Sequence, residues 1–312
     1  MFSEIQLPVN QQVFLPQLNQ KEIQLFIKRE DQIHQQISGN KYRKLKYNLR
    51  EAKGNGYKRL LTFGGAYSNH ILATAVAGKI SGFETIGIIR GNELGRDIYA
   101  TLSQNPTLSK AAQYGMQFVF ISREDYRKKM NTHFLKKMNS KFGSFFVIPE
   151  GGTNELAVKG CQEILTEEDK QFDYICCCVG TGGTMAGLIK SSKKHQNILG
   201  FSALKGNFLK DEIRKYAAHQ NNWKLMMDYH FGGYGKYSDA LITFINEFRK
   251  TTAIPLDPIY TGKMMFGIKD MLKKHLFPRG AKILAVHTGG LQGIVGFNQR
   301  LKNKGSNLRI EI

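Results

Sequence analysis

Cysteines are few and long apolar runs are absent in this sequence, and each scarcity argues against a class of protein. The 312 residues contain four cysteines, too few for the disulfide framework of a small secreted protein. No stretch approaches the roughly 20 consecutive apolar residues that a membrane span needs. The first residues lack a basic segment followed by an apolar core, so no signal peptide is predicted. We therefore expect a cytoplasmic protein without a membrane partner.

The cysteines that are present lack the spacing of metal ligands. Cys176, Cys177 and Cys178 are consecutive, and Cys161 stands alone. A structural metal site needs cysteines or histidines in pairs at a regular spacing. The sequence therefore predicts no metal site, and the three adjacent cysteines are typical of small apolar residues in a buried strand.

Acidic residues are scarce relative to basic ones. The chain has 45 lysines and arginines against 25 aspartates and glutamates, a formal net charge of +20. Such a charge suits nucleic acid, an anionic membrane surface or anionic small molecules as partners. The basic residues are spread along the polar faces of helical stretches, without a basic tail. A nucleic-acid-binding scaffold without catalysis would need clustered basic residues, so we expect no nucleic-acid partner.

Short apolar runs alternate with helical patterns along the chain. The runs are nearly unbroken and rich in isoleucine, valine and phenylalanine, as in parallel strands buried on both faces. This alternation predicts an α/β fold with parallel sheets. Because a glycine-rich stretch at residues 149–152 separates the runs, we expect two sheets in two domains. The seven predicted strands are Arg59–Phe63, Thr85–Ile89, Phe118–Ile121, Phe145–Ile148, Tyr174–Val179, Ile198–Ala203 and Ile283–Val286.

A glycine-rich loop, Gly180–Thr184, separates one predicted strand from the helical pattern that follows. Glycines let the backbone approach a ligand closely, and the free N–H groups of a helix start bind anions. The loop matches neither the P-loop motif nor G-x-G-x-x-G, because Met185 stands at the third glycine position. The sequence therefore indicates a phosphate site, with a plain connecting turn as the alternative.

Two further polar loops follow predicted strands. The first ends in Ser68, Asn69 and His70, where a helical pattern begins. Ser68 or Asn69 could be an ordinary N-cap, or the run could offer donors to a carboxylate or a phenolic oxygen. No G-x-S-x-G motif is present, which argues against a hydrolase triad around His70. The second loop, residues 287–290, is a candidate site by position only.

Lys41 stands in the first turn of a predicted helix that follows Ser38 and Gly39. A lysine there lies at the positive end of the helix dipole. It is either an exposed lysine or one held near a cofactor, where burial and nearby positive charge lower its pKa and favour a Schiff base. A reactive lysine, a phosphate site and a carboxylate-binding loop together indicate a pyridoxal-phosphate (PLP) enzyme.

Four motifs in order resemble those of the 1-aminocyclopropane-1-carboxylate (ACC) deaminase/D-cysteine desulfhydrase family. They are S-G-N-K-x-R-K-L, G-x-x-S-N-H, G-T-G-G-T and D-P-x-Y-T-G-K, and the resemblance extends from about Phe26 to Gly290. It implies a fold type II PLP enzyme with two α/β domains, each with a mostly parallel sheet flanked by helices, and PLP in the cleft between them. The implied large domain comprises residues 1–43 and 152–312, and the small domain residues 44–151. The family is typically homodimeric and acts on small amino acids.

The resemblance also implies a role for each matching residue. Lys41 matches the lysine that bonds to PLP and later moves the α-proton. Asn69 matches the asparagine that hydrogen-bonds the pyridine 3′-oxygen, and Ser68 matches a serine beside the substrate carboxylate. The other implied contacts are Gly180, Thr181, Gly182, Gly183 and Thr184 at the phosphate, Tyr234 and Tyr260 beside the substrate, and Thr261 and Thr288 near the pyridine nitrogen.

The sequence departs from the family pattern where the substrate is held. Tyr67 stands where the family commonly has glutamine. Family members that open the cyclopropane ring tend to carry glutamate and leucine at the positions of Thr261 and Thr288, whereas desulfhydrases tend to carry small hydroxyl residues. We therefore predict D-cysteine desulfhydration, giving pyruvate, hydrogen sulfide and ammonia, over ACC deamination. Another PLP reaction on a D-amino acid stays an alternative.

Overall fold

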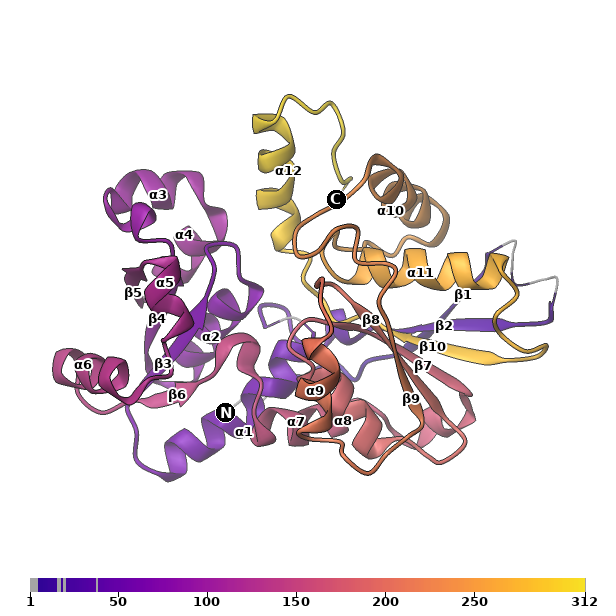
Figure 1. Cartoon of the computed structure of the whole chain (residues 1–312), viewed down its shortest axis with the longest axis horizontal. Helices are drawn as coiled ribbons and strands as arrows, with labels where there is room; N and C mark the ends of the chain where they lie inside the picture. Colours follow the sequence, from indigo (N-terminus) through magenta and orange to yellow (C-terminus); the bar gives the residue numbers. More distant parts are fainter. Residues whose placement is uncertain (1–4, 16–17, 19–20, 38, 312) are drawn as a thin grey trace.

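The computed structural model describes residues 5–15, 18, 21–37 and 39–311, and it arranges them around two sheets (Figure 1). The larger sheet has six strands in the order β1-β2-β10-β7-β8-β9, and the smaller has four in the order β5-β4-β3-β6. All neighbouring strands pair parallel except β1 and β2. The strands are β1 (Asn10–Val13), β2 (Gln24–Lys28), β3 (Arg59–Gly64), β4 (Glu84–Arg90), β5 (Met116–Ile121), β6 (Phe146–Ile148), β7 (Tyr174–Val179), β8 (Asn197–Ser202), β9 (Trp223–Met226) and β10 (Lys282–Val286).

All seven predicted strands are present, and the predicted fold class of two mostly parallel sheets flanked by helices is confirmed. Three strands, β1, β2 and β9, were not predicted. β1 (NQQV) and β9 (WKLM) are four residues long, carry polar residues and form the two edges of the larger sheet, so neither reads as a buried strand. β2 lies inside the sheet but offers only three consecutive apolar residues between Gln24 and Lys28.

The helices surround both sheets. In Figure 1 the helices α2 to α6 accompany the smaller sheet, and α8 to α12 accompany the larger one. Over the described residues, none of the helices has the length and apolar character that crossing a membrane requires. The α-helices are α1 (Asn40–Gly54), α2 (Asn69–Ser81), α3 (Ile98–Gln104), α4 (Pro106–Gln113), α5 (Arg123–Arg127), α6 (Thr132–Phe142), α7 (Glu155–Gln162), α8 (Gly183–Ser191), α9 (Phe208–Arg214), α10 (Asp239–Thr252), α11 (Thr261–Lys273) and α12 (Gly293–Asn303).

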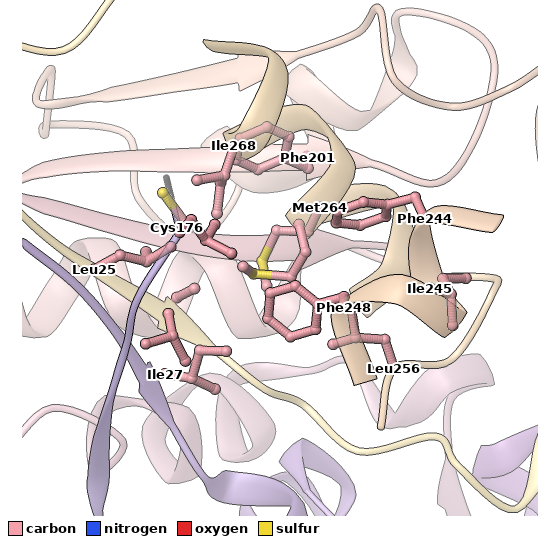
Figure 2. Close-up of a cluster of buried hydrophobic side chains, with 14 of the residues drawn as sticks. Leu25, Ile27, Cys176, Phe201, Phe244, Ile245, Phe248, Leu256, Met264 and Ile268 are labelled. Carbon is pink, nitrogen blue, oxygen red and sulfur yellow. The ribbon is translucent and has the colours of Figure 1, made fainter. Parts of the chain in front are cut away.

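Apolar side chains cover both faces of the larger sheet. On one face, Phe201 of β8 packs with Met264 of α11 and Phe248 of α10 (Figure 2). Cys176 and Cys178 of β7 point to this face, whereas Cys177 points to the opposite cluster, as the alternation of a strand requires. All four cysteines are buried and unpaired, so the prediction that they act as small apolar residues is confirmed.

Helix α1 joins the two halves of the molecule. Its buried residues Leu45 and Leu49 belong to the core cluster of the smaller sheet. On another side, α1 approaches α7 so closely that a Cβ on Gly160 would lie 2.0 Å from the carbonyl oxygen of Arg43. The predicted domain boundary between residues 43 and 44 therefore falls inside a continuous helix. The division into 1–43 plus 152–312 and 44–151 remains our proposal.

Candidate active site

A cavity of about 820 Å³ is lined by loops from both sheets. Loops that follow β3, β6, β7 and β10 meet there with the end of β4 and the start of α1, because the carboxyl ends of parallel strands converge at one edge of a sheet. Gly183 and Thr261 are predicted contacts that do not line this cavity. The predicted residues that do line it are Lys41, Ser68, Asn69, Gly180, Thr181, Gly182, Thr184, Tyr234, Tyr260 and Thr288.

Gly39 fixes the start of α1 against the loop that follows β10. Its φ of +65° and ψ of −147° lie in a region that only glycine occupies easily. A Cβ at Gly39 would lie 1.9 Å from the carbonyl oxygen of Thr288, so a side chain has no room there. This contact places Lys41 at the cavity. Ser38, which opened the predicted motif, lies outside the described residues.

Lys41 has the electrostatic surroundings of a reactive amine. Burial lowers its pKa, and nearby acidic groups oppose that effect only in part. Its Nζ donates a hydrogen bond of 3.3 Å to Oδ1 of Asn40. The amide Nδ2 of Asn40 in turn donates to Oγ1 of Thr184 over 2.8 Å. A lowered pKa raises the fraction of neutral amine, which is the nucleophilic form.

The loop Gly180–Thr184 forms the start of α8. Gly182 is the N-cap residue of this helix with φ +83°, and no side chain of the described residues caps the helix start. The first N–H groups of α8 are therefore free of a side-chain acceptor, as an anion site requires. A Cβ on Gly180 would lie 3.2 Å from the ring of Tyr260.

Lys44 is a functional candidate that the sequence did not single out. Its Nζ donates to Oγ1 of Thr153 over 2.9 Å, to the carbonyl of Gly151 over 3.1 Å and to Oγ1 of Thr181 over 3.3 Å. Burial, aided by the charge of Lys41, lowers the pKa of Lys44 to about 7. One turn of helix separates the two lysines, so Lys44 lies on the same face of α1 as Lys41. The spacing of three residues between Lys41 and Lys44 is the sequence feature that could have identified Lys44.

Ser68 and Asn69 open α2 at the cavity. The Oγ of Ser68 accepts a hydrogen bond of 3.4 Å from the N–H of Ile71, so Ser68 is the N-cap. The side-chain oxygen of Asn69 is buried and has no hydrogen-bond partner among the residues that the structure describes. Since the O and N of an amide are assigned from their partners, this end of Asn69 is available to a ligand as acceptor or donor.

Thr288 and Cys178 form a polar contact at the cavity wall. The Oγ1 of Thr288 lies 2.9 Å from the Sγ of Cys178. Burial raises the pKa of the Cys178 thiol to about 12, so the thiol stays neutral at physiological pH. The wall at this point therefore offers a hydroxyl and a neutral thiol and carries no charge.

Tyr260 and Tyr234 stand next to each other at the cavity. Their ring centroids are 6.2 Å apart with an edge-on arrangement. Asp257 holds the loop of Tyr260, because its carboxylate accepts from the N–H groups of Ile259, Tyr260 and Thr261 over 2.8 to 2.9 Å. The hydroxyl of Thr261 donates to the same carboxylate over 2.7 Å. Thr261 is fully buried in this contact, which gives it a positioning role behind Tyr260.

His70 is buried in the lining of the cavity as a neutral imidazole. Burial, together with the charges of Lys41 and Lys44, lowers the pKa of His70 well below its ordinary value. The hydroxyl of Thr62 donates to the carbonyl of Ile148 over 2.9 Å, so it accepts from Nε2 of His70 over 2.8 Å. We assign His70 a structural role in holding the start of α2. The sequence contains no hydrolase motif that would give it a catalytic one.

The residues present fit PLP. The uncapped helix start of α8 and the ammonium of Lys44 suit a phosphate, and the unpartnered amide of Asn69 suits an oxygen on the ring. Lys41 brings an amine to the same cavity. Among the described residues, no group of histidine, cysteine or acidic side chains could hold a metal ion. Fold and cavity together define a PLP-dependent enzyme of fold type II.

Comparison with known proteins agrees with this class and narrows it. The model of the family "Pyridoxal-phosphate dependent enzyme" matches residues 6–289, so the chain belongs to that family. A Pyrococcus horikoshii protein with the provisional name 1-aminocyclopropane-1-carboxylate deaminase is 31% identical over 294 residues, 89% of this chain and 87% of that one. The bifunctional D-cysteine desulfhydrase/1-aminocyclopropane-1-carboxylate deaminase of Arabidopsis thaliana is 30% identical over 295 residues, 87% of this chain and 73% of that one.

A solved structure agrees as well. The crystal structure of an ACC deaminase homologue covers 96% of this chain with 28% identity and a TM-score of 0.81, and 95% of that chain is matched. The chain is therefore a PLP-dependent lyase/deaminase of the ACC deaminase/D-cysteine desulfhydrase family. The resemblance inferred from the four motifs and the predicted cofactor are confirmed.

Proposed function

We propose that this enzyme eliminates the thiol of D-cysteine and releases pyruvate, hydrogen sulfide and ammonia, with one water molecule consumed. The observation that carries the proposal is the hydroxyl of Thr288 at the cavity wall, where it contacts the neutral thiol of Cys178. A hydroxyl beside the pyridine nitrogen leaves the nitrogen neutral, whereas a carboxylate favours its protonation. Loss of a good leaving group such as thiolate needs a weaker electron sink than opening a carbon ring.

Each predicted site residue has a proposed role in this reaction. Lys41 binds the cofactor and takes the proton from the α-carbon of the substrate, as its lowered pKa supports. The cofactor, when bound, stabilises the negative charge left on that carbon. Ser68 and the start of α2 receive the substrate carboxylate. Tyr234 and Tyr260 lie beside the substrate, and Lys44 joins Gly180–Thr184 in holding the phosphate.

ACC deamination, giving 2-oxobutanoate and ammonia, is the second candidate. It is supported by the names of the Pyrococcus horikoshii and Arabidopsis thaliana relatives. Steady-state kinetics on D-cysteine and ACC with one preparation of holoenzyme discriminates the two. We expect the higher kcat/KM for D-cysteine, and a clearly higher value for ACC would replace the first proposal with the second.

The role of Lys41 has its own test. Purified enzyme should absorb in the visible range, and borohydride should attach the cofactor to a peptide that contains Lys41. Lys41→Ala should abolish turnover and still retain cofactor through the phosphate site, because Gly180–Thr184 is unchanged. Cofactor fixed to a peptide without Lys41 would contradict the assignment.

We also propose that the enzyme is a cytoplasmic homodimer. Ile5, Leu7 and Val9 precede the edge strand β1 and are exposed, as is Phe14 after it. Such a row of exposed apolar side chains is typical of an interface. All four cysteines are unpaired, as a reducing compartment requires. Sedimentation equilibrium should give twice the chain mass, and cell fractionation should recover the enzyme with cytoplasmic markers.

A further inference from the structure

An arginine lies in the cavity at a place that the proposed reaction does not use. Arg90 is the last residue of β4, it is exposed, and its side chain lines the same cavity as Lys41 and Ser68. A guanidinium nitrogen of Arg90 lies 3.6 Å from the position that a Cβ on Gly65 would take. Gly65 belongs to the loop that carries Ser68, so Arg90 adjoins the loop proposed to receive the substrate.

The aromatic ring of Tyr126 holds Arg90 in place. The guanidinium carbon lies 5.6 Å from the centre of this buried ring, within the range of a cation–π contact. Lys129 contacts the same ring, with its Nζ 4.3 Å from the centre. The two cations therefore share one support from α5, the short helix behind the cavity wall.

The two cations differ in whether a described carboxylate neutralises their charge. The Nζ of Lys129 pairs with a carboxylate oxygen of Glu150 at 3.0 Å. Over the part of the chain that the structure describes, Arg90 forms no ion pair with a carboxylate. The cluster of Arg90, Lys129 and Glu150 thus leaves one positive charge at the cavity, and that charge is a planar group with several donors. Such a group matches a carboxylate, sulfonate or phosphate.

We infer that Arg90 forms a second anion subsite, and that the enzyme, besides acting on D-cysteine, binds amino acids with an anionic group on the side chain more tightly than neutral analogues of the same shape. The inference rests on the proposed function for the placement of the α-carboxylate at Ser68 and α2, because Arg90 is then left for a different anion. For a leaving group such as sulfate on the β-carbon, the reaction stays balanced. The C–O bond to the sulfate breaks, the sulfate leaves with the bonding electrons, and hydrolysis gives pyruvate and ammonia.

Binding of two isosteric probes tests the subsite without any turnover. Aspartate and asparagine have the same shape and differ in charge at the side chain. Calorimetric titration of the holoenzyme with both enantiomers of each should show aspartate binding about tenfold or more tightly in the preferred enantiomer, since one charge-assisted hydrogen bond is worth that much. Arg90→Gln should remove the difference between the two probes. Arg90→Lys should keep part of it.

The matched control separates the subsite from the general positive field of the protein. Arg127→Gln removes one positive charge from the exposed end of α5, outside the cavity lining, and should leave the preference for aspartate intact. Equal affinities of the wild-type enzyme for aspartate and asparagine, or no measurable heat from either, would overturn the inference. So would an equal loss of both affinities in Arg90→Gln, because Arg90 would then bind the α-carboxylate.

A kinetic comparison distinguishes failure of the inference from failure of the proposed function. Serine O-sulfate carries an anionic leaving group, and β-chloroalanine carries a neutral one. We expect the ratio of kcat/KM for serine O-sulfate to kcat/KM for β-chloroalanine to be about tenfold or more higher in the wild-type enzyme than in Arg90→Gln. Release of pyruvate from neither compound, together with the aspartate preference, would reject β-elimination and keep the subsite. Release from both with equal ratios in wild type and variant would reject the subsite and keep β-elimination.

Discussion

The ammonium of Lys44 lies 3.3 Å from the hydroxyl of Thr181, and this contact ties α1 to the loop proposed to hold the phosphate. Lys41 is on the same helix three residues earlier. One element therefore carries both the amine proposed to bond to the cofactor and the ammonium proposed to face the phosphate. Displacement of α1 would disturb both of these proposed contacts at once.

The first prediction concerns the pH dependence of phosphate binding. The pKa of Lys44 is about 7 without cofactor, and a phosphate dianion beside it raises that value. Above pH 7, binding must therefore take up a proton, so the affinity falls as the pH rises. We expect the Kd of pyridoxine 5′-phosphate for the apoenzyme to rise by up to about tenfold per pH unit above pH 7. Pyridoxine 5′-phosphate has no aldehyde, which keeps Lys41 out of the equilibrium.

Two variants control that titration. Lys44→Met should weaken binding at pH 7 and flatten the pH profile, because no amine is left to titrate. Lys44→Arg should keep the affinity and also flatten the profile, since the guanidinium stays charged. An unchanged slope in Lys44→Met would assign the pH dependence to another group.

The second prediction concerns the start of α1. Gly39→Ala should prevent cofactor binding and destabilise the protein, because a Cβ would overlap the carbonyl of Thr288 and because the backbone conformation alone costs alanine roughly 1–3 kcal/mol. Thermal unfolding and the visible absorbance report the two effects. Gly54→Ala, at the other end of the same helix with nothing within 4 Å of the new Cβ, is the control and should leave both unchanged. Normal cofactor content in Gly39→Ala would mean that α1 can shift without loss of the site.

The strands that define the fold could be predicted where they form nearly unbroken apolar runs, and the interior strand β2, with only three consecutive apolar residues, was missed. β7 and β10 are nearly unbroken apolar runs at the centre of the larger sheet, and periodicity identifies them directly. β1 and β9 are edge strands whose formation depends on a neighbour far away in the sequence. The composition of a segment does not reveal pairing with a distant strand, so the two edge strands of the larger sheet were not predicted.

Prediction of the site residues from the sequence was limited in the same way. Motifs gave Lys41 and the loop Gly180–Thr184, because both depend on local sequence and on the start of a helix. Arg90 and Lys44 face the cavity only after the sheets assemble, and in the sequence each is an ordinary basic residue among 45. Position in a motif did not determine contact either, since Thr261 follows Tyr260 directly but lies behind the cavity wall.

The third prediction concerns Lys263 of α11, a buried lysine at the end of the last motif. Its Nζ donates to the carbonyls of His230 and Gly233, each over 2.9 Å, and so holds the loop that carries Tyr234. Lys263→Met leaves both carbonyls without this donor, at a cost of about 1–3 kcal/mol for each that stays buried. We expect a lower kcat/KM with unchanged cofactor affinity, measured by kinetics and by absorbance titration.

Lys269 provides the control for this variant. It lies on the same helix, and its Nζ makes a long contact of 4.0 Å with Glu247 and lies 5.1 Å from the centre of the Phe244 ring, so Lys269→Met should resemble the wild type more closely than Lys263→Met does. The pH adds a second readout. Burial lowers the pKa of Lys263 to about 8. The unfolded chain therefore binds more protons between about pH 8 and 10.5, and this lysine makes the stability rise with pH there. That contribution should be absent in Lys263→Met and present in Lys269→Met.

The fourth prediction concerns Thr261, where the family pattern suggests glutamate for ring opening. The hydroxyl of Thr261 is fully buried against the carboxylate of Asp257, so Thr261→Glu brings two carboxylates together in a dry site. One of them must then stay protonated, and its pKa rises. Because the folded state binds the extra proton, the stability of Thr261→Glu should fall relative to the wild type as the pH rises from about 5 to 8.

A second substitution tests the cause of that loss. Thr261→Glu combined with Asp257→Asn removes one of the two charges and should recover much of the lost stability at pH 8. Thermal unfolding of the wild type, both single variants and the double variant at pH 5.5 and pH 8 completes the cycle. ACC deamination should not increase in Thr261→Glu, since the new side chain starts behind Tyr260 and not at the cavity. A variant as stable as the wild type at pH 8, with increased ACC turnover, would show that residue 261 can turn toward the cofactor.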